Sequence, residues 1–592
     1  MKSLVRQWPM RRGTLRPLLR RALPAVAVFV CLCLLAAGWL GFTGWQAHGQ
    51  LTAAVTLARD LGRQLLDGEN EQAERTLADL QRRTGAARRA TDDLVWTTVG
   101  HLPAGGNPTA VREIAVATDE LANQVLPALV SLDPAALMPV GGRFPLDGLR
   151  AAAPTLAAAD EAATRIRDRF AGVSVDGLLR PLRNAVRDLR TELDRLVTLT
   201  DAAHRAAALL PALLGADGDR TYLLAFQNPA ELRATGGMLG AFVVVRARAG
   251  RVDIIDQGTA SDLKVYDEPV LPLSREMRGL YRDLPGIFPA DVNLTPHFPT
   301  AALLYREMYR RQSGRTVDGV LTTDPVALSH LLRVIGPVAV PGFPTLTAKT
   351  AVSALLSEAY LTMKPAEQDR FFAASTVAVF RAIWERPIRL RPLAMAIRDV
   401  VAERRLLFWS AREDEQAQLV DTPLGGVLPE REDVPTVGVF LNDGSGAKLG
   451  YYLSNRAELT VGACVMDGRR ELSLRVSISS RAPRSGLPRS VLGLALADDP
   501  YAARTLVYVF SPAGGAVRQV WVDGAETPIG SGVERRRQVA IVAVDVPPGG
   551  SRLIEVSLLT GKKTTTGAAR LWLTPGVTPW TTHISSAPRC DQ

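Results

Sequence analysis

The stretch "NPAELRATGG", residues 228–237, places an amide, an acid and a base directly after an apolar segment that reads as a buried strand. Asn228, Glu231 and Arg233 would then lie at the carboxyl end of that strand, where open α/β sheets leave a crevice for ligands. The guanidinium of Arg233 is a planar fork of five donors, which suits a carboxylate or a phosphate. These residue types predict a site for an anionic or sugar-bearing ligand.

Two glycines end this stretch and lead into a second apolar segment, residues 241–245. Gly236 and Gly237 can adopt positive φ or let another backbone segment come close, because they carry no Cβ. A purely structural alternative fits the same residue types. In that alternative, Glu231 pairs with Arg233 or another neighbour and holds an irregular loop.

Other common catalytic patterns are missing from the sequence. The histidines stand at positions 48, 101, 204, 297, 330 and 583, and none is two or four residues from another. That spacing gives no reason to expect a zinc site. The sequence also lacks a G-x-S-x-G elbow, a P-loop and a G-x-G-x-x-G string.

The amino terminus predicts a membrane anchor. Basic residues crowd positions 1–21, and residues 22–45 carry no charge. At about 1.5 Å per residue, this segment spans a hydrocarbon core of about 30 Å, with Trp39 and Trp45 suited to the outer interface. Residues 1–21 would be cytoplasmic and the rest of the chain extracytoplasmic. The alternative is a signal peptide cleaved at "AHG", whose apolar region would usually be shorter, about 7–15 residues.

This topology accounts for much of the net charge of +10, so nucleic acid is not an expected partner. Cys31 and Cys33 fall inside the anchor, which leaves Cys464 and Cys590 outside. An oxidising compartment allows those two to form a disulfide, and two free buried thiols are the alternative. Scarce lysine beside abundant arginine and alanine is typical of a GC-rich bacterial genome.

The rest of the chain divides by its hydrophobic periodicity. Helical patterns over residues 47–99, 109–132 and 151–209 predict an antiparallel helical stalk spanning 46–215. Strands then alternate with helices over 216–430, which predicts an α/β domain. From 431 to 592 short strands recur every 8 to 12 residues, the spacing of an antiparallel β-sandwich. We therefore expect an α+β multidomain protein.

Three segments resemble an uncharacterised family of bacterial membrane-anchored proteins: residues 222–256, the string "PADVNLTPHFPTAALLYREMY", and "VDGVLTTDPVALSHLLRVIGPVAV". The resemblance covers roughly residues 217–345. It implies no particular reaction.

The order of these segments is also similar to the LytR-CpsA-Psr family, single-span proteins that transfer glycopolymers from polyprenyl carriers to peptidoglycan, usually with magnesium. The likeness implies that Arg233 and Asn293 match an Arg and an Asn around the pyrophosphate of that family. The family's R-S-D-T motif reads "RAT" here, and its P-R-D string is absent, although "QGTASDLK" supplies Asp262.

These likenesses imply a cell-envelope protein that binds or transfers a glycopolymer or its polyprenyl-phosphate-linked precursor. If it is an enzyme, it would be a phosphotransferase-like glycopolymer ligase using Mg²⁺, with Arg233 on a phosphate and Asp262 or Glu231 assisting metal or proton transfer. Otherwise no cofactor is expected. The alternative is a non-catalytic scaffold that organises protein partners at the envelope.

Overall fold

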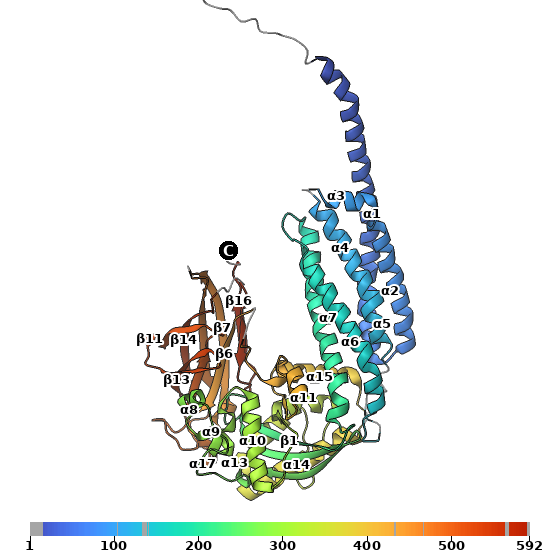
Figure 1. The fold of residues 1–592 in the computed structure, drawn as a ribbon. Coiled ribbons are helices and arrows are strands. Elements are labelled where there is room, and N and C mark those ends of the chain that lie inside the picture. Colours follow the sequence, from blue (N-terminus) through green and yellow to red (C-terminus); the bar gives the residue numbers. More distant parts are fainter. Residues whose placement is uncertain are drawn as a thin grey trace, which may run out of the picture. The chain divides into compact units, whose positions relative to one another are not determined.

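The computed structural model describes residues 16–102, 105–132, 139, 141–386, 388–430, 434–465, 467–562 and 567–588. The chain forms two compact units (Figure 1). The first comprises residues Met1–Leu137 and Asp147–Ala208, and the second comprises Met138–Leu146 and Leu209–Gln592. Each unit is described by itself below.

The first unit is helical. Its helices are α1 (Arg16–Asp67), α2 (Asn70–Thr91), α3 (Leu94–Gly100), α4 (Gly106–Glu120), α5 (Leu126–Val130), α6 (Leu146–Ala171) and α7 (Arg180–Leu213), with a π-helical turn, η1 (Leu121–Val125), between α4 and α5. The last residues of α7 already belong to the second unit. Many of the buried positions are alanines, such as Ala73, Ala110 and Ala163, so the helix backbones can pack closely.

The helical pattern over residues 47–99, which reads as one long helix leaving the membrane, is divided between separate helices in the structure. Helix α1 ends at Asp67, Gly68 adopts φ of +77°, and α2 returns along α1. Glycine populates this left-handed conformation without the Cβ penalty, which is why it commonly follows the last residue of a helix. The helical periodicity continues on both sides of the turn, and it therefore hid the reversal.

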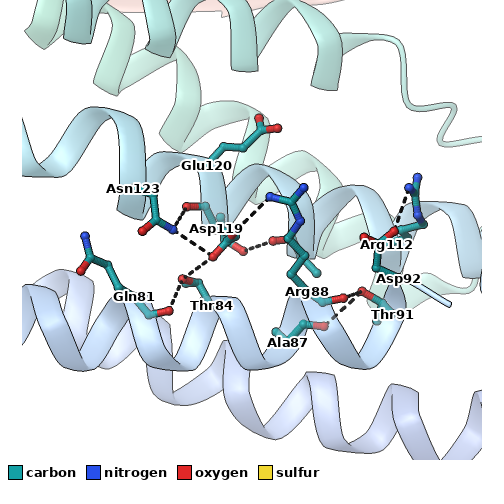
Figure 2. A network of polar contacts seen from close by, with 12 residues as sticks. Gln81, Thr84, Ala87, Arg88, Thr91, Asp92, Arg112, Asp119, Glu120 and Asn123 are labelled. Atoms are coloured by element: carbon teal, nitrogen blue, oxygen red, sulfur yellow. Dashed lines mark hydrogen bonds and ion pairs between the residues drawn. The ribbon is translucent and has the colours of Figure 1, made fainter.

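A buried polar network fastens α2 to α4 beside the π-helical turn (Figure 2). Asp119 Oδ2 accepts a hydrogen bond from Arg88 at 3.0 Å, and Asp119 Oδ1 accepts from Thr84 and Asn123 at 3.3 and 3.0 Å. Gln81 donates to the carbonyl of Ala122 inside the turn, at 3.0 Å. These polar groups bond to one another or to the backbone, so the network fixes how the helices pack and does not present an open site.

Helix α1 is long and apolar enough to cross a membrane over part of its length. In the described part of the chain it is the single helix of this kind, with the apolar stretch falling within Val30–Leu65. The predicted span, residues 22–45, lies inside this 52-residue helix.

The second unit begins with a five-stranded sheet of order β3-β2-β1-β4-β5. The strands are β1 (Arg220–Asn228), β2 (Met238–Arg248), β3 (Arg251–Thr259), β4 (Gly319–Thr323) and β5 (Leu407–Ser410). A tight turn with positive φ at Ala249 and Gly250 joins β2 to β3, as the "ARAG" string predicts. Only β1 and β4 pair in parallel in this sheet, so it is a mixed sheet.

Helices cover both faces of this sheet. The helices between β3 and β6 are α8 (Arg275–Tyr281), α9 (Leu284–Ile287), α10 (Phe298–Ser313), α11 (Pro325–Ile335), α12 (Ala351–Ser353), α13 (Ala359–Thr362), α14 (Pro365–Glu385), α15 (Leu390–Ala402) and α16 (Glu413–Leu419). Helix α10 packs on the face that carries Leu223 and Val244. Helix α14 faces the opposite side, which carries Leu224 and Val243.

Two further sheets follow. One has the order β11-β10-β14-β8-β7-β16 and the other β12-β13-β9-β6-β15. Their strands are β6 (Thr436–Asp443), β7 (Leu453–Cys464), β8 (Arg470–Ser480), β9 (Ala503–Phe510), β10 (Ala516–Val522), β11 (Ala525–Glu526), β12 (Gly530–Glu534), β13 (Arg537–Val546), β14 (Ser551–Leu559), β15 (Arg570–Leu573) and β16 (Thr581–Ser585), with α17 (Arg489–Leu492) before β9.

The two sheets share one hydrophobic cluster, in which Val509 and Val542 of one sheet meet Val476 and Val556 of the other. The prediction of purely antiparallel strands is wrong at the edges. The last two strands, β15 and β16, add in parallel to β6 and β7. Turn spacing reports where strands begin and end, but it does not report on which edge a final strand docks.

The cysteines are only partly described. Cys31 and Cys33 are free, as expected for the anchor, and Cys464 at the end of β7 is not among the free thiols of the described residues. Cys590 lies outside the described residues. The disulfide between Cys464 and Cys590 therefore stays a prediction.

Candidate functional site

The loop after β1 is held close to its own strand. A Cβ on Gly237 would lie 2.2 Å from the carbonyl oxygen of Asn228, and Gly236 adopts φ of +140°. Both glycines are therefore required by the path of the backbone. The loop is buried almost throughout, so its polar side chains find their partners within the protein.

Arg233 is the centre of these contacts. Its Nη2 lies 2.8 Å from Asp291 Oδ1 and 3.1 Å from Glu231 Oε1, its Nε donates to Asp291 at 3.2 Å, and its Nη1 donates to the carbonyl of Leu232 at 2.9 Å. Burial disfavours the charged form, but the two carboxylates outweigh it and raise the pKa of Arg233. Every nitrogen of the guanidinium thus donates to a protein group in this structure.

A second loop, residues 443–450, packs against the first. The backbone N–H groups of Asp443 and Gly450 donate to the carbonyls of Leu232 and Ala230 at 2.9 and 2.8 Å. Lys448 Nζ lies 3.3 Å from Glu231 Oε2. A Cβ on Gly450 would meet the carbonyl of Ala230 at 2.7 Å, so this glycine permits the close approach.

Asp443 adds a further acid to this junction. Burial and the neighbouring Glu231 raise the pKa of Asp443 to about 6, although Arg233 acts in the opposite direction. The backbone N–H groups of Ser445 and Ala447 donate to Asp443 Oδ2 at 2.9 and 3.0 Å. The junction of the two loops is therefore a buried cluster of charges from residues far apart in the sequence.

The other two candidate residues lie in different surroundings. Asn293 is fully buried and donates to Thr235 Oγ1 at 2.9 Å and to the carbonyl of Gly237 at 2.5 Å, which brings it to the same loop as Arg233. Asp262 is exposed and caps its own turn by accepting from the N–H and hydroxyl of Thr259 at 2.7 and 2.9 Å. None of its contacts in the described part of the chain reaches Arg233 or Asn293.

The contacts of Glu231 and Arg233 fit the structural alternative, in which the two side chains pair with each other and hold an irregular loop. Because Arg233 is buried and each of its nitrogens donates to a protein group, it is not presented to a ligand from solution. Within the described residues, no group of three or more His, Cys, Asp or Glu side chains is arranged to hold a metal ion.

A large apolar cavity lies nearby in the same unit, with a volume of about 320 Å³. It lies between one face of the β1–β2 pair and helices α11, α14 and α15, whose side chains line it. The carboxyl ends of the parallel strands β1 and β4 also line it, through Asn228 and Asp324. The cavity reaches the surface along α15, because its lining residue Ile397 is 48 % exposed.

Few polar groups face this cavity. Asn228 Nδ2 donates to the hydroxyl of Tyr360 at 2.7 Å, and Lys448 Nζ lies 5.2 Å from the centre of the Tyr360 ring. The hydroxyl of Ser375 is buried without a hydrogen-bond partner in the described part. A buried hydroxyl without a partner costs free energy, so Ser375 is a group that a ligand or a water molecule could satisfy.

Asp324 is polar but fully engaged. It caps α11 by accepting from the N–H of Ala327 at 2.7 Å, and it pairs with Arg405 at 2.6 Å. Arg405 also donates to the carbonyl of Gly576 and so connects the first sheet with the segment after β15. Asp324 therefore fixes the end of β4 beside the cavity.

The sequence predicts that Asn228 lies at a ligand site, and Asn228 does line the cavity. The sequence gives no sign of the cavity itself. Its apolar lining comes from helices over residues 351–400, whose apolar positions read as ordinary core. An excess of apolar residues on α15, where Met395 and Ile397 remain exposed, is the signal that could have drawn attention to this helix.

Comparison with known families gives one match. Residues 217–360 match the family described as "Protein of unknown function (DUF4012)". The matched region includes the loop of Arg233, strand β4 and the first of the helices around the cavity. No curated protein matches the sequence. The chain thus contains a region similar to a family of unknown function, and that region holds much of the candidate site.

Proposed function

We propose that this protein is a single-span cell-envelope protein that binds the polyprenyl chain of a phosphate-linked glycopolymer precursor in the cavity beside β1 and β4. The cavity is the observation that carries the proposal. Its walls are almost entirely apolar, it reaches the surface, and its volume is at the low end of the range of about 300–1,000 Å³ typical of ligand sites.

The membrane anchor supports this choice of ligand. Residues 22–45 would hold the chain at the membrane in which polyprenyl carriers reside, with the cytoplasmic end at residues 1–21 and the second unit extracytoplasmic. The anchor would thus keep the protein on the membrane that carries such a ligand. The matching of an apolar chain to an apolar cavity provides most of the affinity.

The phosphate end of such a ligand belongs at the polar end of the cavity. Asn228 and Tyr360 line the cavity, and Lys448 lies over the Tyr360 ring, so this is the place where a positive charge comes near the apolar lining. We assign Lys448 to the phosphate in preference to Arg233, whose three nitrogens each already donate to a protein group.

The contacts favour a protein that binds the precursor without transferring its glycopolymer. Arg233 and Asn293 are occupied by protein partners, and Asp262 lies apart from both. In this interpretation, residues 216–430 form a LytR-CpsA-Psr-like domain that has kept a lipid cavity, and residues 431–592 form a β-sandwich. The internally paired charges also favour the second candidate, a non-catalytic scaffold for envelope proteins.

Ligand retention by the purified full-length protein tests the proposal. Native mass spectrometry after addition of a long-chain polyprenyl phosphate should show a bound ligand. Val379→Trp on α14 fills the cavity and should abolish binding, whereas Arg381→Trp adds the same bulk on the exposed side of α14 and should not. Lys448→Met should weaken binding of the phosphate but leave binding of the uncharged polyprenol nearly unchanged.

Equal retention of the polyprenyl phosphate by the two tryptophan variants would exclude the cavity as the site. Absence of binding in the unmodified protein would leave the scaffold as the better account.

A further inference from the structure

Helix α3 lies against α1 at the point where the apolar segment ends (Figure 1). The indole Nε1 of Trp96 in α3 donates to Thr43 Oγ1 at 2.9 Å, and the Trp96 ring lies 3.6 Å from the position of a Cβ on Gly44. The indole Nε1 of Trp39 donates to Asp93 Oδ2 at 2.5 Å. Two tryptophans thus fix α3 to α1 between residues 39 and 44.

The pairing of Trp39 with Asp93 sets the depth of α1 in a membrane. Asp93 also accepts from the backbone N–H groups of Val95 and Trp96, so its carboxylate caps α3. An ionised carboxylate does not lie in hydrocarbon without a large cost in free energy. If α1 spans a membrane, the hydrocarbon would therefore end near Trp39. About 20 residues suffice for a span, and residues 22–41 of the predicted segment 22–45 would provide them.

Exposed leucines gather at this end of the helical unit. Leu94 is 84 % exposed, Leu102 is 55 % exposed and Leu179 is 64 % exposed. Leu94 is the first residue of α3, and Leu102 lies just beyond its end. Leu179, in the segment before α7, is tied to the same end because its N–H donates to Asn107 Oδ1 at the start of α4, at 2.9 Å. Three exposed leucines at one end of the unit need a partner that takes up apolar side chains.

We propose that this end of the helical unit rests on the membrane surface, with Leu94, Leu102 and Leu179 inserted among the lipid headgroups. The proposal rests on the membrane anchor proposed above. Its occupant is the bilayer because the leucines lie at the end of the unit where α3 is fixed to α1, and because Phe42 and Trp45 of α1 are also exposed there. The acids at this end are paired, Asp92 with Arg112 at 3.1 Å and Asp93 with Trp39, so contact with neutral lipid needs no anionic headgroup.

Quenching by lipids tests this contact. The starting protein is the full chain with Cys31 and Cys33 replaced by alanine. In it, Leu94, Leu102 or Leu179 is replaced by a single cysteine. Each variant is labelled with bimane and placed in nanodiscs of phosphatidylcholine. Lipids with a nitroxide near the headgroup should quench all three labels several-fold more than a label at Val55→Cys. Val55 is equally an exposed apolar residue, but it lies 16 residues beyond Trp39 on α1, about 24 Å along the helix.

A label on native Cys33 separates the two levels of the proposal. Quenching at Cys33 by nitroxides deep in the acyl chains, with the three leucine positions no more quenched than Val55, would overturn the surface contact and leave the anchor standing. Absence of quenching at Cys33 would overturn the anchor itself. The protein without introduced cysteines gives the background from Cys464 and Cys590. Because all three leucines are exposed, their replacement should not disturb folding, and circular dichroism of each variant checks this.

Discussion

Arg404 and Arg405 are neighbours in the chain with opposite surroundings. Arg405 is buried and pairs with Asp324 at 2.6 Å and Glu403 at 2.5 Å. Arg404 stacks on Trp572, with its Cζ 3.4 Å from the ring centre, while its Nε and Nη1 are buried without a hydrogen-bond partner in the described part. Burial lowers the pKa of Arg404 to about 9. No sequence pattern distinguishes the two, because the difference arises from distant partners.

Methionine at each position should therefore have opposite effects on the free energy of unfolding. Arg405→Met leaves Asp324 and Glu403 without their cation and should cost about 3–5 kcal/mol. Arg404→Met removes a poorly satisfied charge and loses a cation–π contact, so stability should stay within about 1 kcal/mol of the unmodified protein or increase. Urea denaturation of the full chain measures both, with the exposed Arg398→Met as the control. A loss at position 404 as large as at 405 would contradict this account.

At the scale of elements, the loop 228–237 joins the first sheet to the loop after β6. The sequence shows the polar residues of both loops and correctly marks the strands on either side. It does not show that Asp443, more than 200 residues later, reaches Leu232 and that Asp291 reaches Arg233. An Arg after a strand has the same sequence pattern whether its partners are ligand oxygens or carboxylates of the same chain. The residue type does not show which distant residue it will pair with.

The same limit explains which parts of the fold could be predicted. Local signals are read correctly, as in the turn at Ala249 and Gly250, which lies at the "ARAG" string. The parallel pairing of β1 with β4, the docking of β15 and β16, and the cavity beneath α14 depend on contacts between distant segments. Periodicity cannot report those contacts.

The buried junction should make stability depend on pH through Asp443. The folded state holds the pKa of this carboxyl at about 6, above its ordinary value of 3.8, so the unfolded chain releases the proton first as pH rises. The free energy of unfolding therefore falls, through Asp443, as the pH rises from about 4 to about 6. Asp443→Asn still accepts from Ser445 and Ala447 but cannot ionise. Its free energy of unfolding, relative to the unmodified protein, should increase across that window by about 1–3 kcal/mol.

Thermal or urea denaturation at pH 4, 5, 6 and 7 measures this difference. Glu526→Gln on β11 is the control, because it removes one exposed carboxylate from the same unit. If the difference between Asp443→Asn and the unmodified protein does not change with pH, then the charge cluster does not control this carboxyl.

At the scale of the whole molecule, the second unit depends on how its last residues are fastened. Strand β16 adds to β7, and beyond it Ala587 N–H donates to the carbonyl of Gly567 at 2.9 Å. Arg470, the partner of Cys464 in the β7–β8 register, donates to the carbonyls of Gly462 and Pro588 at 3.1 and 2.5 Å. The chain is thus held beside the end of β7 only two residues before Cys590.

This position supports the predicted disulfide between Cys464 and Cys590, which would close a loop of more than 120 residues. Closing a long loop restricts the unfolded chain, so Cys464→Ser should lower the free energy of unfolding by about 2–5 kcal/mol. Cys33→Ser, in the anchor, should leave the unfolding of the second unit unchanged. Peptide mapping without reduction should recover residues 464 and 590 in one cross-linked fragment. Modification of both thiols by a maleimide in the unreduced, denatured protein would instead show that hydrogen bonds alone hold the end of the chain.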